Sequence, residues 1–435
     1  MHTSFVLVTL LTLTEGFLPS HTPASPDTTL LLSKPPISSS SSSSSSSVVS
    51  FDAPDEEKPK WAAGGVVSDL VNALIGIKPF FSLMKLGARQ QLIGTAEQNG
   101  VPWRERALAL RQKQAILDQY FESCLVDSVE YPEYYTQEFH AYEEGNLNWP
   151  AAYECEQATM SMALRVWPTE SLSPKEAQDR LRYSFIDTVR EYIDGITLTD
   201  QERVKQQNRV SSSSQSGAKP MFPFGSLFKK SEQSQPGALN TMEDKVNKAK
   251  YSSSVDSIVD LGCSVGVSTF YLSEAFPLSK VTGVDLSPQF LAVAKERQWS
   301  YPITSPVSRN VDFVHGQAEN MEPFIASESK DLITACFIFH ELPQDASRVI
   351  LAEMFRITST SGLGTVAITD NNPKSAVIQN LPPPIFTLMK STEPWSDEYY
   401  AFDLEQAMRD AGFVDVITVE TDPRHRTVLG RRSAE

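Results

Sequence analysis

The sequence predicts an α/β fold: a mostly parallel sheet with a nucleotide-binding turn, preceded by a helical region. The first observation is the order of elements at residues 256–285: a short apolar run, a turn with two glycines, a helix, a second apolar run and an acid. That order is the plan of a nucleotide-binding βαβ unit. The second observation is the alternation of apolar runs with helical patterns up to residue 412. The third is a pair of short runs at 413–419 and 426–429 that flank the turn TDPR, as a closing antiparallel strand pair would.

The turn at residues 262–266 (GCSVG) is suited to a close approach between backbone and ligand. Glycine tolerates the dihedral angles that such a turn requires, and the helix after it points free N–H groups at the ligand. Asp285 ends the second strand 23 residues after Gly262, and an acid there can accept hydrogen bonds from two ribose hydroxyls. The dinucleotide pattern G-x-G-x-x-G fails, because Ser264 and Val267 stand where it needs glycine.

The elements that follow the turn alternate between helix and strand. A helix is expected at 267–276, a strand at 280–284, and a helix from Ser287 and Pro288 to about residue 298. Strands are expected at 311–315, 332–339 and 366–369, with a helix at 343–357 between the last two. A helix at 402–411 is stopped by Gly412 before the closing strand pair.

The pattern D-x-G-x-x-x-G, formed by Asp260, Gly262 and Gly266, resembles motif I of the class I S-adenosylmethionine (SAM) methyltransferases. The resemblance continues in order through GVDLSP at 283–288, HGQAE at 315–319, DLIT at 331–334 and the run at 362–369, so that it covers roughly residues 250–430. It implies a Rossmann-like class I methyltransferase fold, with a mostly parallel seven-stranded sheet, an antiparallel closing strand and SAM as the cofactor. The alternative, an unrelated βαβ protein, does not account for this ordered run of matches.

The resemblance also implies which residues bind the cofactor. They are Asp260, Gly262, Ser264, Gly266, Asp285, Leu286, Gln317, Ala318 and Glu319. Two of them depart from the family pattern: Ser264 stands where many relatives have Gly, and Gln317 where many have Asp. Serine is small enough for the turn, and glutamine can hydrogen-bond an adenine amino group. Asp260 is expected either to order the turn or to lie near the amino group of SAM.

Candidates for proton transfer follow the strands, at the edge where ligands bind in open α/β sheets. His340 and Glu341 follow the fourth expected strand, and a histidine can serve as a base near neutral pH. The alternative is that this pair only closes a loop. Asp370 follows the fifth strand and either joins the site or caps a helix. His315 is expected to line the adenine side.

The string DLGCSVG…GVDLS…GQAE is most similar to the ubiquinone/menaquinone-biosynthesis group and the type 11 methyltransferases. That similarity implies a small-molecule methyl acceptor, with C-methylation of a hydrophobic, prenyl-quinone-like ring as the leading expectation. A small-metabolite O-methyltransferase is one alternative. A noncatalytic SAM-fold scaffold is another, although a scaffold has no need of Asp260, Gly262, Gly266 and Asp285.

Residues 61–204 are predicted to be helical, with helices at 103–129 and 151–167 and a third that Ser173 caps before Pro174. The aromatic loop at 139–149 contains His140 and Tyr142. These side chains either cover SAM, as residues of a leading segment do in many small-molecule methyltransferases, or pack on the helices. Residues 205–245 are rich in Ser, Gln, Gly and Pro and are predicted to be a disordered insert, and the methyltransferase domain is expected at 246–435.

The N-terminal residues are typical of a targeting leader. Residues 1–16 contain an apolar run of signal-peptide length, and residues 17–55 form a Ser-rich, acid-poor segment that fits a transit peptide. The junction before Phe17 resembles that of the two-part plastid leaders of algae with complex plastids, so a plastid (chloroplast) location is expected. The alternative is a secretory leader followed by a disordered linker.

Composition excludes several classes of protein. A net charge of −16 argues against a nucleic-acid binder, and no apolar run is long enough for a transmembrane helix. The four cysteines lack any C-x-x-C spacing, which favours buried free thiols over disulfides or a metal site. Residues 61–96 contain one acid and three cations among apolar side chains, so they are a candidate for peripheral membrane contact. The alternative is that this face packs in the core.

Overall fold

The computed structural model describes residues 89–138, 142, 144–210, 255–381, 389 and 392–434, with the side chains of 196–210 excepted. The predicted leader (1–16 and 17–55), residues 61–88 of the predicted membrane arm and His140 lie outside the described residues, as do residues 211–245 of the predicted insert. Contacts divide the chain into residues 1–50 and 51–435, and every element below belongs to the second unit.

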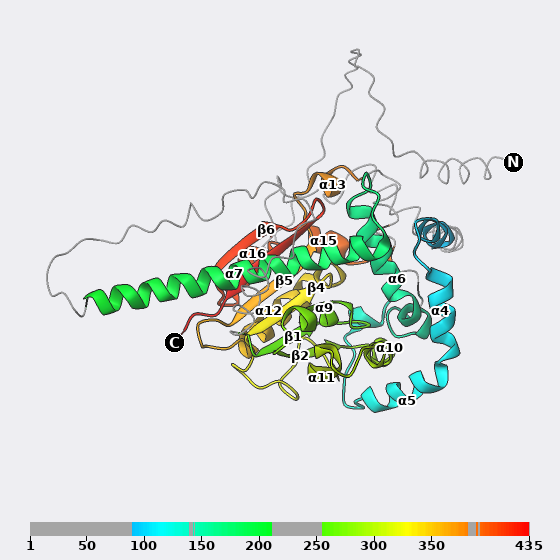
Figure 1. The fold of residues 1–435 in the computed structure, drawn as a ribbon, viewed down its shortest axis with the longest axis horizontal. Coiled ribbons are helices and arrows are strands. Elements are labelled where there is room, and N and C mark those ends of the chain that lie inside the picture. The colour runs from blue at the N-terminus through cyan, green and yellow to red at the C-terminus, as the bar shows by residue number, and fades with distance from the viewer. Residues whose placement is uncertain are drawn as a thin grey trace, which may run out of the picture. The chain divides into compact units, whose positions relative to one another are not determined.

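A seven-stranded sheet forms the centre of this unit, in the order β3-β2-β1-β4-β5-β7-β6 (Figure 1). The strands β1 to β5 are parallel, and β7 runs antiparallel to both of its neighbours. The predicted sheet is therefore confirmed. The strand bounds are β1 Ser257–Leu261, β2 Lys280–Asp285, β3 Val311–His315, β4 Leu332–Cys336, β5 Thr365–Asn371, β6 Val414–Glu420 and β7 His425–Arg431.

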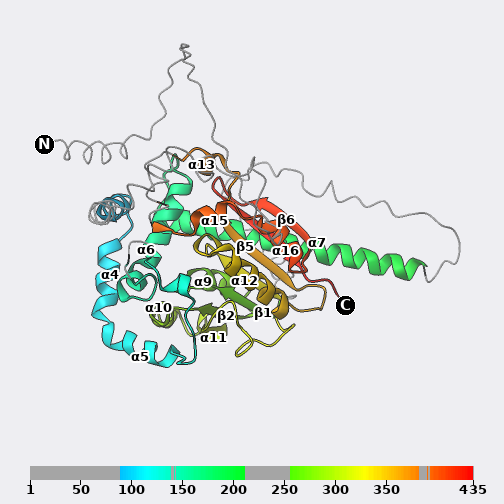
Figure 2. The same cartoon turned by 180° about the vertical axis from the view of Figure 1, so that it is seen from behind.

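Helices cover both faces of the sheet, because neighbouring strand residues point to opposite sides. Ile258 belongs to a core cluster with α7 (Pro174–Val210) and α9 (Val267–Ala275), whereas Val259 belongs to a cluster with α12 (Gln344–Ile357) and α16 (Leu404–Asp410). These helices are labelled around the sheet in Figure 2. Strands buried on both faces need continuous apolar runs, which explains the sequence pattern. The helices around the core are α9 Val267–Ala275, α10 Pro288–Trp299, α11 Pro306–Asn310, η2 Phe339–Glu341, α12 Gln344–Ile357, α13 Ala376–Gln379, α15 Ser396–Tyr400 and α16 Leu404–Asp410.

The leading helices belong to the same packed body. After a helix at 89–98, they are α4 Trp103–Gln112, α5 Gln114–Cys124, η1 Glu133–Thr136, α6 Trp149–Val166 and α7 Pro174–Val210. Helix α7 starts with a capping box in which Ser173 and Glu176 bond each other's backbone N–H groups. Its apolar face, with Phe185, Ile186 and Val189, shares a core cluster with β1 and β4. The sheet therefore depends on α7 to cover one face.

Several boundaries differ from the sequence prediction, and three of the differences have consequences. The fourth strand ends at Cys336, because Phe337 takes a left-handed backbone conformation (φ 61°) that turns the chain away. The single helix expected at 103–129 is two helices separated at Lys113, and the second ends at Cys124. Helix α7 continues to Val210, six residues into the segment expected to be disordered.

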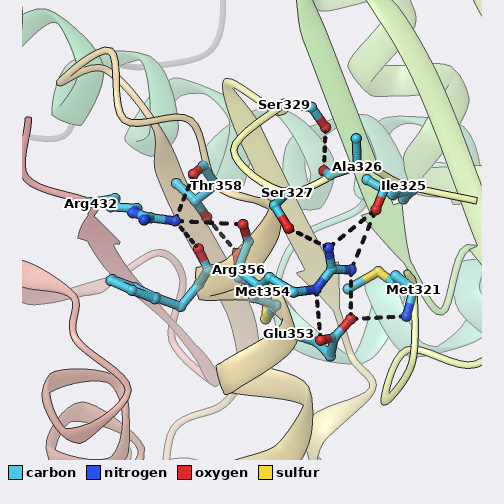
Figure 3. A network of polar contacts seen from close by, with 11 residues as sticks. Met321, Ile325, Ala326, Ser327, Ser329, Glu353, Met354, Arg356, Thr358 and Arg432 are labelled. Carbon is cyan, nitrogen blue, oxygen red and sulfur yellow. Dashed lines mark hydrogen bonds and ion pairs between the residues drawn. The ribbon is translucent and has the colours of Figure 1, made fainter. Parts of the chain in front are cut away.

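A polar network fixes the segment between β3 and β4 to helix α12 (Figure 3). Arg356 forms a bidentate pair with Glu353 at 2.8 Å and also donates to the carbonyl of Ile325 and to Ser327. Glu353 in turn accepts the backbone N–H of Met321 at 2.9 Å. The contacts matter for the site, because Met321 lies two residues after Glu319, the last residue of the segment expected to flank adenine.

Candidate functional site

The glycine turn lies at the carboxyl end of β1, where three residues have positive φ: 62° at Gly262, 50° at Ser264 and 79° at Gly266. A Cβ built on Gly262 would lie 2.6 Å from the side chain of Ile338, so the turn has no room for a larger residue there. Ser264 is a non-glycine residue in the same region of backbone space, and its hydroxyl lies 3.0 Å from the Cys155 thiol of α6. The chain thus forms the turn that the sequence predicted.

Asp285 ends β2 and faces the turn. Its Oδ2 accepts the N–H of Ser264 at 2.7 Å, and its Oδ1 accepts the N–H of Ser287 at 2.8 Å. A carboxylate has about four acceptor positions, and the backbone N–H of Leu286 also acts on this one, so acceptor capacity remains for a ribose hydroxyl. Burial raises the pKa of Asp285 to about 6, although the N–H groups of Ser287, Ser264 and Leu286 act in the opposite direction. The residues present therefore fit the ribose of SAM.

Asp260 is held inside the fold directly before the turn, and its role toward the cofactor stays a prediction. The carboxylate is fully buried and accepts hydrogen bonds from Ser268, Thr269 and Thr334 at 2.6 to 2.8 Å. These bonds join β1 to the start of α9 and to β4. Burial raises the pKa of Asp260, and the three hydroxyls offset part of that shift.

A segment that sequence reasoning passed over lies along the predicted adenine side. We call residues 125–136 the tyrosine strap. The backbone N–H of Val126 donates to His315 Nδ1 at 3.0 Å, and the Tyr131 hydroxyl lies 3.1 Å from His315 Nε2. Further along, Gln317 Nε2 donates to the Glu130 carbonyl, and the Tyr134 hydroxyl donates to Glu319. The aromatic cluster YPEYY at 131–135 is the sequence signal that marks this segment.

The other two predicted residues of this side lie close by. The carbonyl of Leu286 is 3.1 Å from His315 Nε2, and the Ala318 side chain packs into the core cluster beneath the sheet. The cofactor assignments of these residues stay predictions, but the fold brings all of them to one edge of the sheet.

In the aromatic loop, Tyr142 follows the second expectation, which is that its side chain packs on the helices. Tyr142 donates to Glu154 at 2.9 Å and lies beneath the Arg89 guanidinium, so it packs on the helices. Asn146 instead reaches the site, where its carbonyl accepts from Ser287 at 2.8 Å and its amide lies 3.5 Å from Glu341.

His340, in η2 after β4, and Asp370 form a buried pair. Asp370 lies within β5, one residue before its end, and not after the strand as expected. His340 Nδ1 lies 2.8 Å from Asp370 Oδ1, and the His340 N–H donates to Oδ2 at 3.1 Å. Asp370 also accepts the backbone N–H of Asn371 within β5, and the His340 N–H that it accepts belongs to the short helix η2. Asp370 therefore joins the site, and its helix-capping role stays a prediction. Burial lowers the pKa of His340, but the charge and hydrogen bond of Asp370 outweigh it and raise this pKa to about 10.

Two further carboxyl groups surround this pair. Burial raises the pKa of Glu341 to about 8; His340 opposes that shift, and Glu393, Asp370 and Asp285 add to it. Burial also raises the pKa of Glu393, which sequence reasoning missed because it lies in no recognisable motif. The arrangement can hold and release protons beside the turn, which is what a base near neutral pH requires.

The state of the cysteines and of possible metal ligands can also be read from the structure. All four cysteines are free thiols. Within the described ranges, no group of three or more His, Cys, Asp or Glu residues is arranged to hold a metal ion. None of the described helices is both long and apolar enough to cross a bilayer.

Comparison with known proteins gives matches in this region. Residues 258–362 match a family described as "Methyltransferase domain". The malonyl-[acyl-carrier protein] O-methyltransferase of Bacillus cereus is 31% identical over 117 residues, 27% of this chain and 39% of that protein. The demethylmenaquinone methyltransferase of Staphylococcus aureus is 32% identical over 124 residues, 28% of this chain and 46% of that protein. The chain thus spans less than half the length of these two curated relatives.

Solved structures also match at low similarity. A SAM-dependent methyltransferase from Aquifex aeolicus has a TM-score of 0.31 and 20% identity, covering 43% of this chain and 88% of that one. An O-methyltransferase family protein from Burkholderia thailandensis has a TM-score of 0.34 and 15% identity, covering 42% and 52%.

The sheet order, the glycine turn and Asp285 agree with a class I SAM-dependent methyltransferase fold. Residues 258–362 match the methyltransferase domain family.

Proposed function

We propose that the protein is a SAM-dependent methyltransferase acting on a small acceptor. The observation that carries the proposal is the Asp285 carboxylate, fixed by two backbone N–H groups beside a turn of three positive-φ residues. When bound, SAM supplies a methyl group on its sulfonium sulfur. Asp285 would hold the ribose, and the N-terminus of α9 would face the rest of the cofactor.

The buried acidic residues would accept the proton that the acceptor loses. Both O-methylation of a hydroxyl and C-methylation of a phenol-like ring require a proton to leave the acceptor. With its pKa near 8, Glu341 is the better base, because Asp370 keeps His340 protonated at neutral pH. The positive charge of a sulfonium in the site would lower both pKa values and favour the base form of Glu341. His340 would then balance charge and position the acceptor.

The leading acceptor is a hydrophobic, prenyl-quinone-like ring that is methylated on carbon. The similarity of residues in this domain to a demethylmenaquinone methyltransferase supports it. Small-metabolite O-methylation is the second candidate, supported by the similarity to a malonyl-[acyl-carrier protein] O-methyltransferase. A noncatalytic SAM-fold scaffold is disfavoured, because a scaffold would not require a buried, charged Asp285 at the turn.

Titration of the full chain with SAM by calorimetry tests the first step of the proposal, since a scaffold would give no heat of binding. Lipid extracts of cells with and without the gene then test the acceptor. A quinone lighter by one methyl group in the deletion supports C-methylation. Unchanged quinones, together with a lighter small metabolite, favour the second candidate.

We also propose that the protein is targeted to the plastid and touches a membrane through residues 61–96. The Ser-rich leader and the Phe17 junction support the first proposal, and the basic, apolar composition of residues 61–96 supports the second. Residues 93 and 96 pack against α4 and α6, so the membrane surface would lie on residues 61–88. A cytosolic or secreted fluorescent fusion of residues 1–60 would contradict plastid targeting. Failure of the mature chain to float with anionic liposomes would contradict the membrane contact.

A further inference from the structure

We propose that Arg165 and Arg424 together bind an anionic group of the methyl acceptor, either a carboxylate or a phosphate. Arg165 lies in the last turn of α6, and Arg424 lies directly before β7, so the two are far apart in the sequence. The inference rests on the proposed function and deepens it, because it names the chemical class of the acceptor. It narrows both candidate acceptors to molecules that carry an acid group.

The first argument is the position of Arg424 at the carboxyl end of β5. Its Nε atom donates to Asn371 Oδ1 at 2.9 Å, and Asn371 is the last residue of that strand. Asp370, the residue before it, is bonded to His340. Because open α/β sheets bind ligands at this edge, the Arg424 guanidinium lies on the side of the site where the acceptor proton would leave. The bond to Asn371 uses Nε, so the two terminal nitrogens remain to donate to a ligand.

The second argument is that Phe337 brings the end of α6 to the same place. Its ring packs against a core cluster that contains Val166, and it lies edge-on to His425 with 4.9 Å between ring centroids. Arg165 directly precedes Val166, and Arg424 directly precedes His425. One ring therefore connects the neighbours of both arginines. In agreement with this placement, burial and the positive charge of Arg424 both lower the pKa of Arg165.

The third argument is the lack of an opposite charge. Within the described ranges, neither guanidinium forms an ion pair with an acidic side chain. Asp422, which is close to Arg424 in the sequence, is instead bonded to His425 Nδ1 at 2.8 Å. Two positive charges near each other are unfavourable unless an anion lies beside them. A ligand anion would supply that charge, and the planar guanidinium matches two oxygens of a carboxylate or a phosphate.

The acids of the site do not supply this charge. Burial holds the pKa of Glu341 at about 8, so this carboxyl is largely uncharged at neutral pH, and Asp370 is balanced by His340. Burial also raises the pKa of Glu393, although the charges of His340 and Arg424 oppose that shift. The arginines therefore leave this side of the site with a net positive charge, which favours an anionic acceptor.

The wall on which Arg165 lies is open to ligands. Its side chain is exposed to water, yet the protein around it removes enough hydration to lower its pKa, as expected for a residue that lines a cleft. A charged side chain in such a position can meet a ligand without any movement of the backbone.

The experiment measures the binding of benzoate, phenyl phosphate and benzamide to the full chain by calorimetry, with and without saturating S-adenosylhomocysteine. Benzamide has the shape of benzoate but no charge, so the parent should bind benzoate about tenfold more tightly than benzamide. Tighter binding of phenyl phosphate than of benzoate would identify the anionic group as a phosphate, and the reverse order would identify it as a carboxylate.

Arg165→Gln and Arg424→Gln should each weaken benzoate binding about tenfold, while the affinities for benzamide and S-adenosylhomocysteine stay those of the parent. Arg180→Gln is the matched control, because Arg180 also lies near the end of α6, over the Trp167 ring, but is paired with Glu170 at 2.6 Å. Thermal unfolding of each variant checks the fold. Protection of both arginines from phenylglyoxal by benzoate, followed by mass spectrometry, is an independent measurement.

Equal binding of benzoate and benzamide by the parent would overturn the inference, as would benzoate binding that both glutamine variants retain. It would also be overturned by a chain that binds S-adenosylhomocysteine but neither anionic probe. A chain that does not bind S-adenosylhomocysteine would instead contradict the proposed function, and the comparison of the probes without cofactor would still decide whether the two arginines form an anion site.

Discussion

Asp285 shows how one side chain serves both fold and function. Its oxygens accept two backbone N–H groups that fix the turn, and burial brings its pKa up to about 6. The same burial makes each hydrogen bond to a ligand stronger, because a desolvated carboxylate has no competing water. The sequence predicted this residue from its distance to Gly262 along the chain, since a βαβ unit places an acid at the end of its second strand.

Removal of the Asp285 carboxylate should therefore abolish tight cofactor binding. Each charge-assisted hydrogen bond to ribose is worth about 1.5 to 3 kcal/mol, so Asp285→Ala should weaken SAM binding by about tenfold or more. The parent should also lose affinity as the pH falls through 6, because protonation removes the charged acceptor. Calorimetry between pH 5 and 8 measures both effects. Equal affinity in the mutant and the parent would show that the carboxylate is not a ligand.

The His340–Asp370 pair should control turnover and not cofactor binding. Asp370→Asn removes the charge that raises the pKa of His340, so the imidazole should titrate at lower pH, and kcat should fall. His340→Ala and Glu341→Ala should also lower kcat while the SAM dissociation constant stays near that of the parent. NMR titration of the histidine C–H signals, together with assays on the true acceptor, checks these outcomes. Full activity in both alanine variants would show that His340 and Glu341 are structural residues.

At the level of elements, local sequence patterns predicted the helices and strands whose apolar residues recur with a regular period. Strand β3 and helix α10 are found where apolar runs and the Ser287 cap placed them. The end of β4 was not predictable, since Phe337 adopts φ 61° only because tertiary contacts with Arg182 and His425 hold it. The tyrosine strap was missed because its first residues, 125–129, were assigned to the end of the helix expected at 103–129. The contacts that hold it are with residues 315–319, which are distant in the sequence.

The strap should detach when His315 is protonated. Burial lowers the pKa of His315 below its usual value, and a proton on Nδ1 would replace the acceptor of the Val126 N–H with a donor. Hydrogen exchange of the Val126 amide, corrected for its intrinsic pH dependence, should therefore show protection at pH 7.5 that is lost in acid. His315→Asn offers a non-titrating acceptor and serves as the control. Protection that is the same at both pH values in the parent would refute this coupling.

The Glu353–Arg356 network should matter for stability and little for chemistry. Burial alone would raise the pKa of Glu353, but the hydrogen bonds of Arg356 and Met321 hold it below its usual value. The stabilisation is therefore present above the carboxyl's unfolded pKa and is lost as the pH falls below it. Arg356→Leu should lower the free energy of unfolding by about 2 kcal/mol in urea. Val349→Ala, at an exposed position on the same helix, is the control.

At the scale of the whole described unit, the leading helices and the strand-bearing part form one body. The sequence suggested a boundary near residues 205–245, because composition changes there. The core clusters extend across that boundary, because α7 covers β1 and β4, and α5 and α6 pack on α10. Amino-acid composition shows where the chain is polar. It does not show which apolar faces pack together, and those of the shared core are far apart in the sequence.

A fragment of residues 246–435 should accordingly fail to fold by itself. Without α7, Ile258, Leu332 and Ala367 would face water, and exposed apolar strands promote aggregation. Residues 89–435 should give a cooperative thermal transition, whereas the shorter fragment should give none. Within the full chain, Val189→Asp places a charge in the shared core and should destabilise the fold by about 3 kcal/mol or more. Lys175→Ala, on the exposed side of α7, should have little effect. A soluble 246–435 fragment that binds SAM as tightly as the full chain would show that the strand-bearing part is independent of α7.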